Sequence, residues 1–276
     1  MSQTGKAGRF GAGKDAAQRA RASGTQVLQR AALLMRLIAS RGHAGMRLAD
    51  VVKESALEHP TAHRILKGLM AEGLVVKLTD SRCYGLGPLA FELGLAAAPQ
   101  FDLSGICGPS LARIAERTGD TVFLIARSGY DSVCIDRKEG AFPIKTFTLD
   151  VGTRRPLGAG AGGLALLMLL PGEEVDGVIA ANAARLGGYN KLTVPALLKA
   201  LRRSRELGYA LNDIHNTAGV TTLGLPVVNR HGQPFAAITI GAISSRMGGD
   251  RQKQLVAVLR TEVRQIEKAI GGSAQP

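Results

Sequence analysis

The hydrophobic positions between residues 26 and 73 recur with the spacing of three successive amphipathic helices. Residues 26–40 carry apolar side chains at helical spacing, and residues 47–54 repeat the pattern over a shorter stretch. After a tight connection at residues 55–58, residues 59–73 form a third helical pattern, with Pro60 at its first position and Gly73 at its C-terminal cap. We therefore predict three helices, of which the last two form a helix-turn-helix.

The third predicted helix has an apolar side and a cationic side. We expect an inward stripe formed by Ile65, Leu66, Leu69 and Met70. The remaining positions carry the residues that we expect to face DNA, namely Pro60, Thr61, His63, Arg64 and Lys67. An ordinary amphipathic surface helix with a solvated polar side explains this helix equally well when it is taken by itself. Its neighbours favour a DNA-recognition helix.

Two β-prone runs follow the helices, and a polar turn at residues 79–82 separates them. This pattern predicts a hairpin, and a hairpin after a helix-turn-helix is a wing. We predict that residues 25–87 form a winged helix-turn-helix DNA-binding domain. In it, Thr61 and Arg64 would face the bases of the major groove, whereas Lys67 and the wing residue Arg82 would contact phosphates.

The remainder of the chain predicts a linker and a second domain. Residues 88–102 are expected to form a linker helix whose apolar positions contribute to a dimer interface. Residues 103–271 alternate between helical and strand-like patterns, which predicts an α+β domain with a largely antiparallel sheet flanked by helices. The expected helices are 103–118, 160–170, 173–182, 195–206 and 250–270, and the expected strands are 121–126, 132–136, 144–147, 208–213, 220–228 and 235–243.

The charge of the chain favours a polyanionic partner. The 276 residues suffice for two domains, and their formal net charge is +13. Residues 1–100 contain 14 basic and 7 acidic residues, a net charge of +7, so the predicted DNA-binding part is the more basic per residue. Residues 1–24 are rich in Gly, Lys and Arg and are predicted to be a disordered basic tail. This tail would either add phosphate contacts or act only as a solubilising extension.

Cysteine content and hydropathy indicate a cytoplasmic protein. The three cysteines, Cys83, Cys107 and Cys134, are widely spaced without a C-x-x-C motif, so we expect neither a disulfide framework nor a zinc site. The longest aliphatic run, at residues 164–170, is far shorter than the roughly 20 residues of a membrane helix. We also find no signal-peptide pattern and expect no contact with a membrane.

A glycine run at residues 158–163 leaves several alternatives open. It satisfies G-x-G-x-x-G, so an enzyme or nucleotide-binding module built on this run is the alternative function. That fingerprint needs a buried strand directly before the glycines, whereas Arg154-Arg155-Pro156-Leu157 precedes them. A glycine-rich helix start would also suit a small carboxylate, or the glycines could serve close helix–sheet packing. Catalytic and metal-binding motifs are missing, so we expect no enzyme activity, cofactor or metal.

The order of several short motifs resembles the IclR-type family of bacterial transcriptional regulators. These motifs are Gln26-Val27-Leu28-Gln29-Arg30-Ala31, Pro60-Thr61-Ala62-His63-Arg64-Ile65-Leu66, Tyr84-Gly85-Leu86-Gly87, Gly152-Thr153-Arg154-Arg155-Pro156-Leu157, Glu206-Leu207-Gly208-Tyr209-Ala210 and Gly219-Val220. The resemblance covers about residues 25–270. It implies an N-terminal winged helix-turn-helix that binds double-stranded operator DNA, a dimerising linker helix, and a C-terminal GAF/profilin-like domain that holds a small-molecule effector. It also implies a homodimer or a dimer of dimers.

The resemblance further implies the effector-binding positions, which fall at Ala159, Gly160, Asn212, Thr222, Thr239 and Gly241. Their hydroxyl, amide and backbone groups would suit an organic acid, with its carboxylate at a helix N-terminus. The family often has Ala-Thr-Ala-x-Gly-Lys where this chain has Ala159-Gly160-Ala161-Gly162-Gly163-Leu164, and an acidic pair where Ile214-His215 stands. The effector of a relative is therefore not carried over to this chain.

Overall fold

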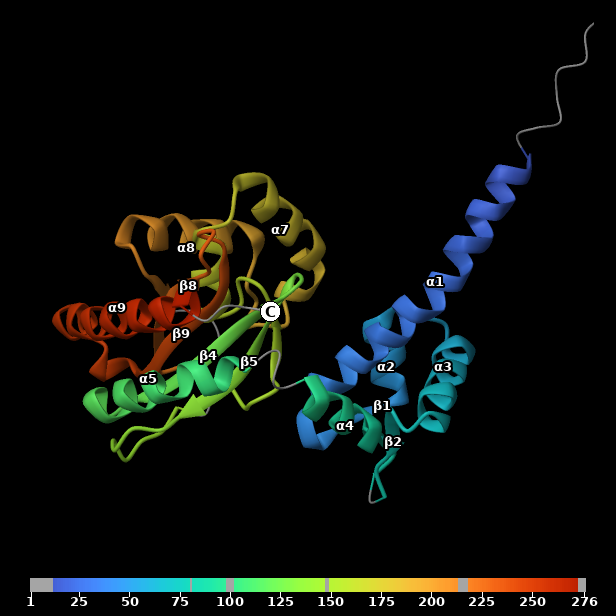
Figure 1. Cartoon of the computed structure of the whole chain (residues 1–276), viewed down its shortest axis with the longest axis horizontal. Helices are drawn as coiled ribbons and strands as arrows, with labels where there is room; N and C mark the ends of the chain where they lie inside the picture. The colour runs from blue at the N-terminus through green and yellow to red at the C-terminus, as the bar shows by residue number, and fades with distance from the viewer. Residues whose placement is uncertain (1–11, 80, 98–101, 147–148, 213–217, 273–276) are drawn as a thin grey trace, which may run out of the picture. The chain divides into compact units, whose positions relative to one another are not determined.

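The chain forms two units, residues 1–97 and residues 98–276, which are described separately (Figure 1). The structure is a computed structural model that describes residues 12–79, 81–97, 102–146, 149–212 and 218–272, without the side chains of residues 12–24 and 271–272.

The N-terminal unit packs three helices against a small antiparallel sheet with strand order β1-β3-β2. Leu34, Ile38, Val51 and Leu66 are fully buried, so one core joins the three helices. The predicted winged helix-turn-helix is confirmed. Its elements are α1 (Ala12–Ala39), a 3-10 turn (Gly42–Ala44), β1 (Met46–Arg47), α2 (Leu48–Ser55), α3 (His59–Ala71), β2 (Val75–Lys77), β3 (Cys83–Leu86) and α4 (Pro88–Ala97).

The helix α3 buries a narrower stripe than its sequence predicts. Its buried residues are Ala62, Leu66 and Leu69, which follow the i, i+4, i+7 spacing of one helical side. Met70 is 38% exposed, so its place in the inward stripe was wrong. The prediction counted Met70 because it is apolar, but it lies about 100° further around the helix than Leu69. Pro60 occupies the first turn, as expected, although the helix begins one residue earlier.

The first helix begins earlier than predicted. The helix α1 spans Ala12–Ala39, so residues 12–24 are helical and not a disordered tail, while residues 1–11 lie outside the described part. Alanine and arginine, which supply seven of these 13 residues, have high helix propensity and can extend a helix that is anchored at its other end. The predicted linker helix corresponds to α4, which ends at Ala97, and residues 98–101 are not described.

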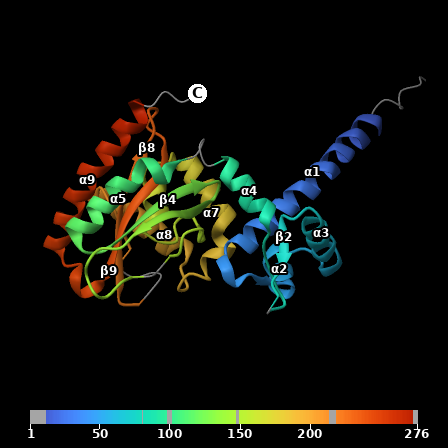
Figure 2. The same cartoon turned by 60° about the horizontal axis from the view of Figure 1, so that its bottom comes forward.

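The C-terminal unit is built on a six-stranded sheet with the order β6-β5-β4-β9-β8-β7. Figure 2 shows its strands β4, β8 and β9 beside the helices α5 and α9. Every pairing among its described strands is antiparallel, which agrees with the predicted α+β class. Its elements are α5 (Leu103–Thr118), β4 (Thr121–Ser128), β5 (Asp131–Lys138), β6 (Arg154–Pro156), α6 (Ala161–Met168), α7 (Gly172–Leu186), α8 (Val194–Leu207), β7 (Ala210–Asn212), β8 (Val220–Val228), β9 (Pro234–Ile243), a 3-10 turn (Ser244–Arg246) and α9 (Gly249–Gly272).

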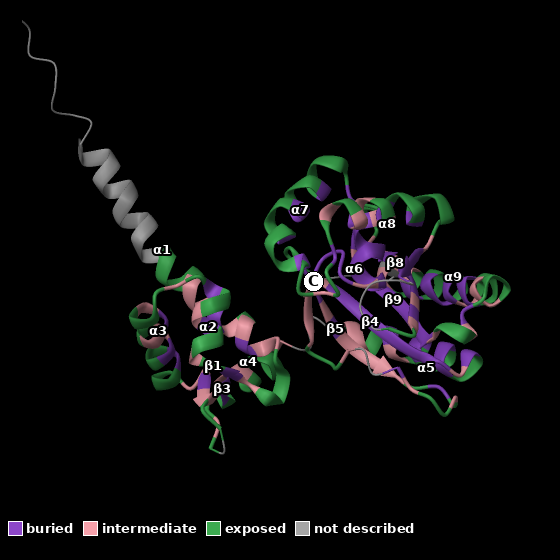
Figure 3. Cartoon of the chain, turned by 180° about the vertical axis from the view of Figure 1, so that it is seen from behind, coloured by how far each residue is buried: buried purple, intermediate pink, exposed green. Residues whose placement is uncertain are grey.

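Helices cover both faces of this sheet because alternate residues of its strands are buried on opposite sides. On one face, Val122 and Leu124 of β4 pack with residues of α5 and α9. On the other face, Phe123 and Ile125 pack with the buried helix α6 and, beyond it, with α7 and α8 (Figure 3). None of the described helices is long and apolar enough to cross a membrane.

One predicted strand is absent, and another takes its place at the edge of the sheet. Residues 144–146 form no strand, and residue 147 lies outside the described part. The edge of β5 pairs instead with β6, in the register Ser132↔Arg155. The hydroxyl of Thr146 donates to the carbonyl of Gly241 at 2.9 Å, so this segment is held by a side chain. β-propensity in the sequence did not reveal which segment would occupy this edge.

Candidate functional site

The polar side of α3 and the wing form the first candidate site. Arg64, Lys67 and Arg82 are exposed, and Thr61 and His63 are half-buried. The turn before α3 fixes where this helix begins: Ala56 has a left-handed φ of 54°, and Glu58 is the N-cap residue. Arg64 and Lys67 lie three residues apart and hence on neighbouring positions of one side of the helix. This arrangement presents cations and a hydroxyl on the second helix of a helix-turn-helix, which is the helix that enters the major groove in DNA complexes of this motif.

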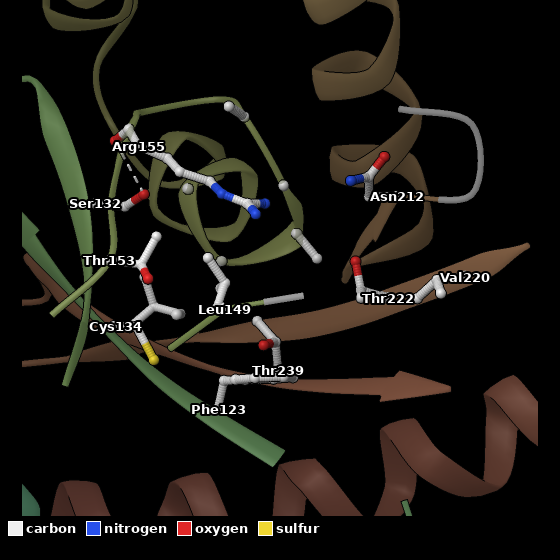
Figure 4. A pocket seen from close by; sticks show the side chains of 16 residues that line it. Phe123, Ser132, Cys134, Leu149, Thr153, Arg155, Asn212, Val220, Thr222 and Thr239 are labelled. Carbon is white, nitrogen blue, oxygen red and sulfur yellow. Dashed lines mark hydrogen bonds between the residues drawn. The ribbon is translucent and has the colours of Figure 1, made fainter. Parts of the chain in front are cut away.

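A pocket between the sheet and the start of α6 forms the second candidate site (Figure 4). Its cavity volume is about 40 Å³, room for about three water-sized groups. The lining comes from β4, β5, β6, β7, β8, β9 and the glycine run, and consists of Phe123, Ile125, Ser132, Cys134, Leu149, Thr153, Arg155, Ala159, Gly160, Ala161, Gly162, Gly163, Asn212, Val220, Thr222 and Thr239. The pocket therefore suits a small molecule with polar groups.

The predicted effector-binding residues largely meet at this pocket. Ala159, Gly160, Asn212, Thr222 and Thr239 all line it. The sixth predicted residue does not: Gly241 is absent from the lining, and a Cβ atom built on it would lie 2.9 Å from Thr146 Oγ1 and 3.3 Å from Thr222 Cγ2. Side chains that pack over Gly241 thus separate it from the cavity.

The glycine run serves both the pocket and the packing of α6. Gly160 is the N-cap residue of α6, with φ 97° and ψ 163°, a conformation that is essentially restricted to glycine. A Cβ atom on Gly162 would lie 2.6 Å from Ile125 Cγ1, and one on Gly163 would lie 2.8 Å from the nitrogen of Gly158. Gly162 thus lets the helix approach β4 closely, Gly163 lets it approach the chain at Gly158, and the first residues of α6 line the pocket.

The guanidinium of Arg155 projects into the pocket (Figure 4). Its neighbour on β6, Arg154, binds the carboxylate of Asp131 at 3.2 Å. Burial lowers the pKa of Arg155, and its guanidinium carbon lies 5.9 Å from the centre of the Tyr189 ring. The side chain nevertheless remains cationic, because an arginine pKa starts so far above neutrality. The described part of the lining includes no carboxylate.

Sequence reasoning missed Arg155 as a pocket residue. The prediction used the segment that contains it as a family motif and as an argument against a dinucleotide site, and no strand was expected there. A strand places successive side chains on opposite faces, and that alternation would have separated Arg154 from Arg155. Ser132 and Cys134 lie on a strand that was predicted, but which of its faces borders a pocket depends on the strands and helices packed around it, and Thr153 lies in the segment just before the unpredicted strand β6.

Cys134 contributes a neutral thiol to the pocket. Desolvation by burial, only partly offset by Arg137, raises its pKa to about 12. Its Sγ atom lies 3.6 Å from the carbonyl oxygen of Asp136, to which it donates. A thiol with this pKa is protonated at neutral pH and is a poor nucleophile. Cys134 therefore acts as a small, weakly polar wall of the cavity.

The surroundings of the glycine run remove the support for a dinucleotide site. The dinucleotide fingerprint needs a parallel βαβ unit with the glycines directly after its first strand. Here the strand before the run is β6, an edge strand that pairs antiparallel with β5, and the described sheet is antiparallel throughout. The close approach of Gly162 and Gly163 to their neighbours accounts for the glycines instead.

Comparison with known proteins identifies the family of both units. The family described as "Bacterial transcriptional regulator IclR C-terminal" matches residues 95–268, and the "IclR helix-turn-helix domain" matches residues 27–79. The chain belongs to the IclR family of transcriptional regulators. This IclR-family chain is 28% identical over 277 residues to the HTH-type transcriptional repressor AllR of Escherichia coli K12, covering 100% of both chains. It is also 28% identical to AllR of Salmonella typhi, over 98% of both chains.

Solved IclR-family structures share the fold. An IclR transcriptional regulator from Silicibacter sp. superposes with a TM-score of 0.74 at 22% identity, covering 91% of this chain and 98% of the other. An IclR homologue from Microbacterium hydrocarbonoxydans, complexed with 4-hydroxybenzoate, superposes with a TM-score of 0.65 at 22% identity, covering 88% and 98%. With both family models matched, this IclR-family regulator combines a DNA-binding helix-turn-helix with the C-terminal domain of that family.

Proposed function

We propose that this IclR-family regulator binds an operator through α3 and its wing, and that a small organic acid in the pocket of the C-terminal unit modulates that binding. A relative with known structure is complexed with 4-hydroxybenzoate, an aromatic acid, which supports a ligand of this class. The observation that carries the proposal is the guanidinium of Arg155, which projects into a pocket bordered by the start of α6. A cation and helix N–H groups together favour a carboxylate.

The proposed DNA contacts divide into base readout and phosphate binding. Arg64, one turn into α3, has the bidentate geometry that recognises guanine, and Thr61 precedes it on the same side of the helix. Lys67, further along α3, and Arg82, on the wing, are exposed cations and would bind phosphates. Pro60 and His63 complete the surface that faces the groove. DNA within the bacterial cytoplasm is the partner in this proposal.

The proposed assembly is a homodimer or a dimer of dimers. In α4, Phe91, Leu93 and Leu95 are exposed by 68%, 55% and 58%, and this helix has no buried residue. An apolar helix of this kind fits an interface between two copies. Paired recognition helices would then read two half-sites of one operator.

A pocket-filling variant tests the effector proposal. Gly160→Leu is unsuitable, because the φ of 97° at Gly160 would strain any side chain there. Thr222 lies on the regular strand β8 and lines the pocket, so Thr222→Leu fills the cavity without straining the backbone. We first screen small carboxylates by thermal shift; a ligand at 100 times its Kd raises stability by about 2.7 kcal/mol.

The expected result is that Thr222→Leu binds a promoter fragment as the parent does but no longer responds to the acid found in the screen. Thr222→Ser, which keeps the hydroxyl and adds no volume, is the matched control and should respond. A normal response of Thr222→Leu would show that the acid acts elsewhere. Failure of the parent to select one DNA fragment against excess competitor DNA would contradict the operator-binding part.

A further inference from the structure

The guanidinium of Arg155 projects into the pocket and also contacts an aromatic ring. Its carbon lies over the ring of Tyr189, 5.9 Å from the ring centre, and Tyr189 is outside the described lining of the pocket. We propose that Tyr189, on the turn between α7 and α8, is a positioning residue of the effector site: its ring covers the guanidinium of Arg155 and holds it toward the carboxylate of the ligand. This inference rests on the proposed function, in which Arg155 binds that carboxylate.

The turn that carries Tyr189 is anchored on both sides of this residue. Leu186 and Leu192, which flank it, are 0% and 4% exposed and belong to the core beside α6. The N–H of Tyr189 donates to the carbonyl of Leu186 at 2.9 Å, and the N–H of Leu192 donates to the carbonyl of Tyr189 at 3.1 Å. Both backbone groups of Tyr189 are thus bonded within the turn, so its ring starts from a fixed position.

The backbone directly after Tyr189 adopts a costly conformation. Asn190 and Lys191 have φ values of 51° and 55°, in the left-handed region. Residues other than glycine rarely occupy that region, and such strain persists where the surrounding structure compensates for it, often beside a ligand site. Two such residues in succession indicate that the tertiary structure, and not local preference, sets the course of this turn.

The helix before the turn is bound to the strand pair that carries Arg155. Arg185, in the last turn of α7, binds the carboxylate of Asp131 at 2.7 Å. Asp131 begins β5 and pairs with Pro156, the residue after Arg155 on β6. This ion pair fixes the end of α7 beside β6, so Tyr189 and Arg155 lie together although they are distant in sequence.

A ring over a guanidinium affects both the direction and the solvation of that group. The face of an aromatic ring attracts a cation within about 6 Å of its centre, which favours the side-chain conformation of Arg155 that lies against Tyr189. The ring also excludes water from one side of the guanidinium, and a partly desolvated cation attracts a carboxylate more strongly. The pKa of Arg155, which burial lowers, agrees with partial desolvation. Tyr189 should therefore raise the affinity for an anion and not for a neutral ligand.

Calorimetric titration of the full chain compares the carboxylic acid found in the thermal-shift screen with its primary amide, which has nearly the same shape but no charge. We expect Tyr189→Ala to weaken binding of the acid about tenfold, the size of a partly desolvated cation–π contact, and to change binding of the amide less than about twofold. Tyr189→Phe keeps the ring and should retain most of the affinity for the acid. Tyr130→Ala, the same change at a tyrosine that is 55% exposed, is the matched control.

Phenylglyoxal, which reacts with accessible guanidinium groups, tests the contact without a ligand. Removal of the ring should expose Arg155, so its modification should be several times faster in Tyr189→Ala than in the parent, and unchanged in Tyr130→Ala. Arg154, whose guanidinium binds Asp131, is the internal reference, and tandem mass spectrometry distinguishes the two arginines. An unchanged rate at Arg155 in Tyr189→Ala would overturn the proposal.

Two further results would also overturn the proposal. Equal weakening of acid and amide by Tyr189→Ala would mean that the ring only shapes the pocket. Parent-like affinity for the acid in Tyr189→Leu, which keeps an apolar side chain without the aromatic face, would mean that packing suffices; this variant also replaces Tyr189→Ala if thermal unfolding shows that the latter is not folded. A parent that binds no carboxylate would contradict the proposed function instead, and the modification rate of Arg155 would still decide whether Tyr189 covers it.

Discussion

The packing of Gly162 against β4 gives a prediction whose size follows from the structure. A Cβ atom at this position would lie 2.6, 2.9 and 3.0 Å from Cγ1, Cβ and Cγ2 of Ile125. Ordinary carbon contacts are about 3.5–4.0 Å, so Gly162→Ala requires a movement of roughly 1 Å. Ile125 is 3% exposed and β-branched, and α6 is buried, which leaves little room for that movement. Overpacking of this kind costs about 1–3 kcal/mol.

Gly177 provides the matched control. It lies on α7, is exposed, and a Cβ atom there would meet nothing within 4 Å. Gly177→Ala should therefore raise the free energy of unfolding by about 0.4–1 kcal/mol, because alanine lowers the entropy of the unfolded chain. Gly162→Ala gains the same stabilisation from the unfolded chain, but the cost of overpacking should exceed it, so this variant should be less stable than the parent. At about 2–4 °C per kcal/mol for a unit of this size, the two variants should shift Tm in opposite directions.

Thermal and urea unfolding, followed by tyrosine fluorescence, measure this difference. The chain has no tryptophan and four tyrosines, and Tyr130, Tyr189 and Tyr209 lie in the C-terminal unit. The double variant Gly162→Ala/Ile125→Ala should lose less stability than the sum of the losses in the two single variants, because the truncated side chain at position 125 makes room for the new methyl group. A Gly162→Ala variant as stable as Gly177→Ala would refute the close approach of α6 to β4.

Three further predictions concern DNA, assembly and pH. Arg64→Ala should weaken operator binding by about 1–3 kcal/mol and relax specificity at one base pair, measured by competition among operator variants, whereas Lys67→Ala should weaken all sequences equally. Phe91→Asp should shift sedimentation toward a smaller species, since it places a charge on the apolar surface of α4; an unchanged profile would exclude α4 from the interface. Although desolvation opposes it, hydrogen bonding to Arg113 holds the pKa of Glu262 below its usual value. The stability that this ion pair contributes is present above the unfolded pKa and is lost as pH falls through the folded pKa. In Glu262→Gln, the free energy of unfolding should therefore depend less on pH in the acid range.

Local sequence patterns by themselves determined most of the N-terminal unit. The helices around residues 47–55 and 59–71, the wing turn and the leucine-rich core follow from hydrophobic spacing and from turn residues, which depend only on near neighbours in sequence. Strands β8 and β9 and the helix α9 were predicted within a few residues for the same reason. Five of the six predicted effector positions line one pocket, and they came from the resemblance to the family.

Tertiary structure decided the features that depend on pairing between distant segments. Whether residues 144–147 or Arg154–Pro156 would pair with β5 could not be read from β-propensity, because strand register is set by partners elsewhere in the chain. That choice directs Arg155 into the pocket. Likewise, only the approach of α6 to Ile125 shows that Gly162 serves packing, and only the side chains above Gly241 show why it misses the cavity. A sequence shows which residues have small side chains or charge; long-range contacts set where those groups meet.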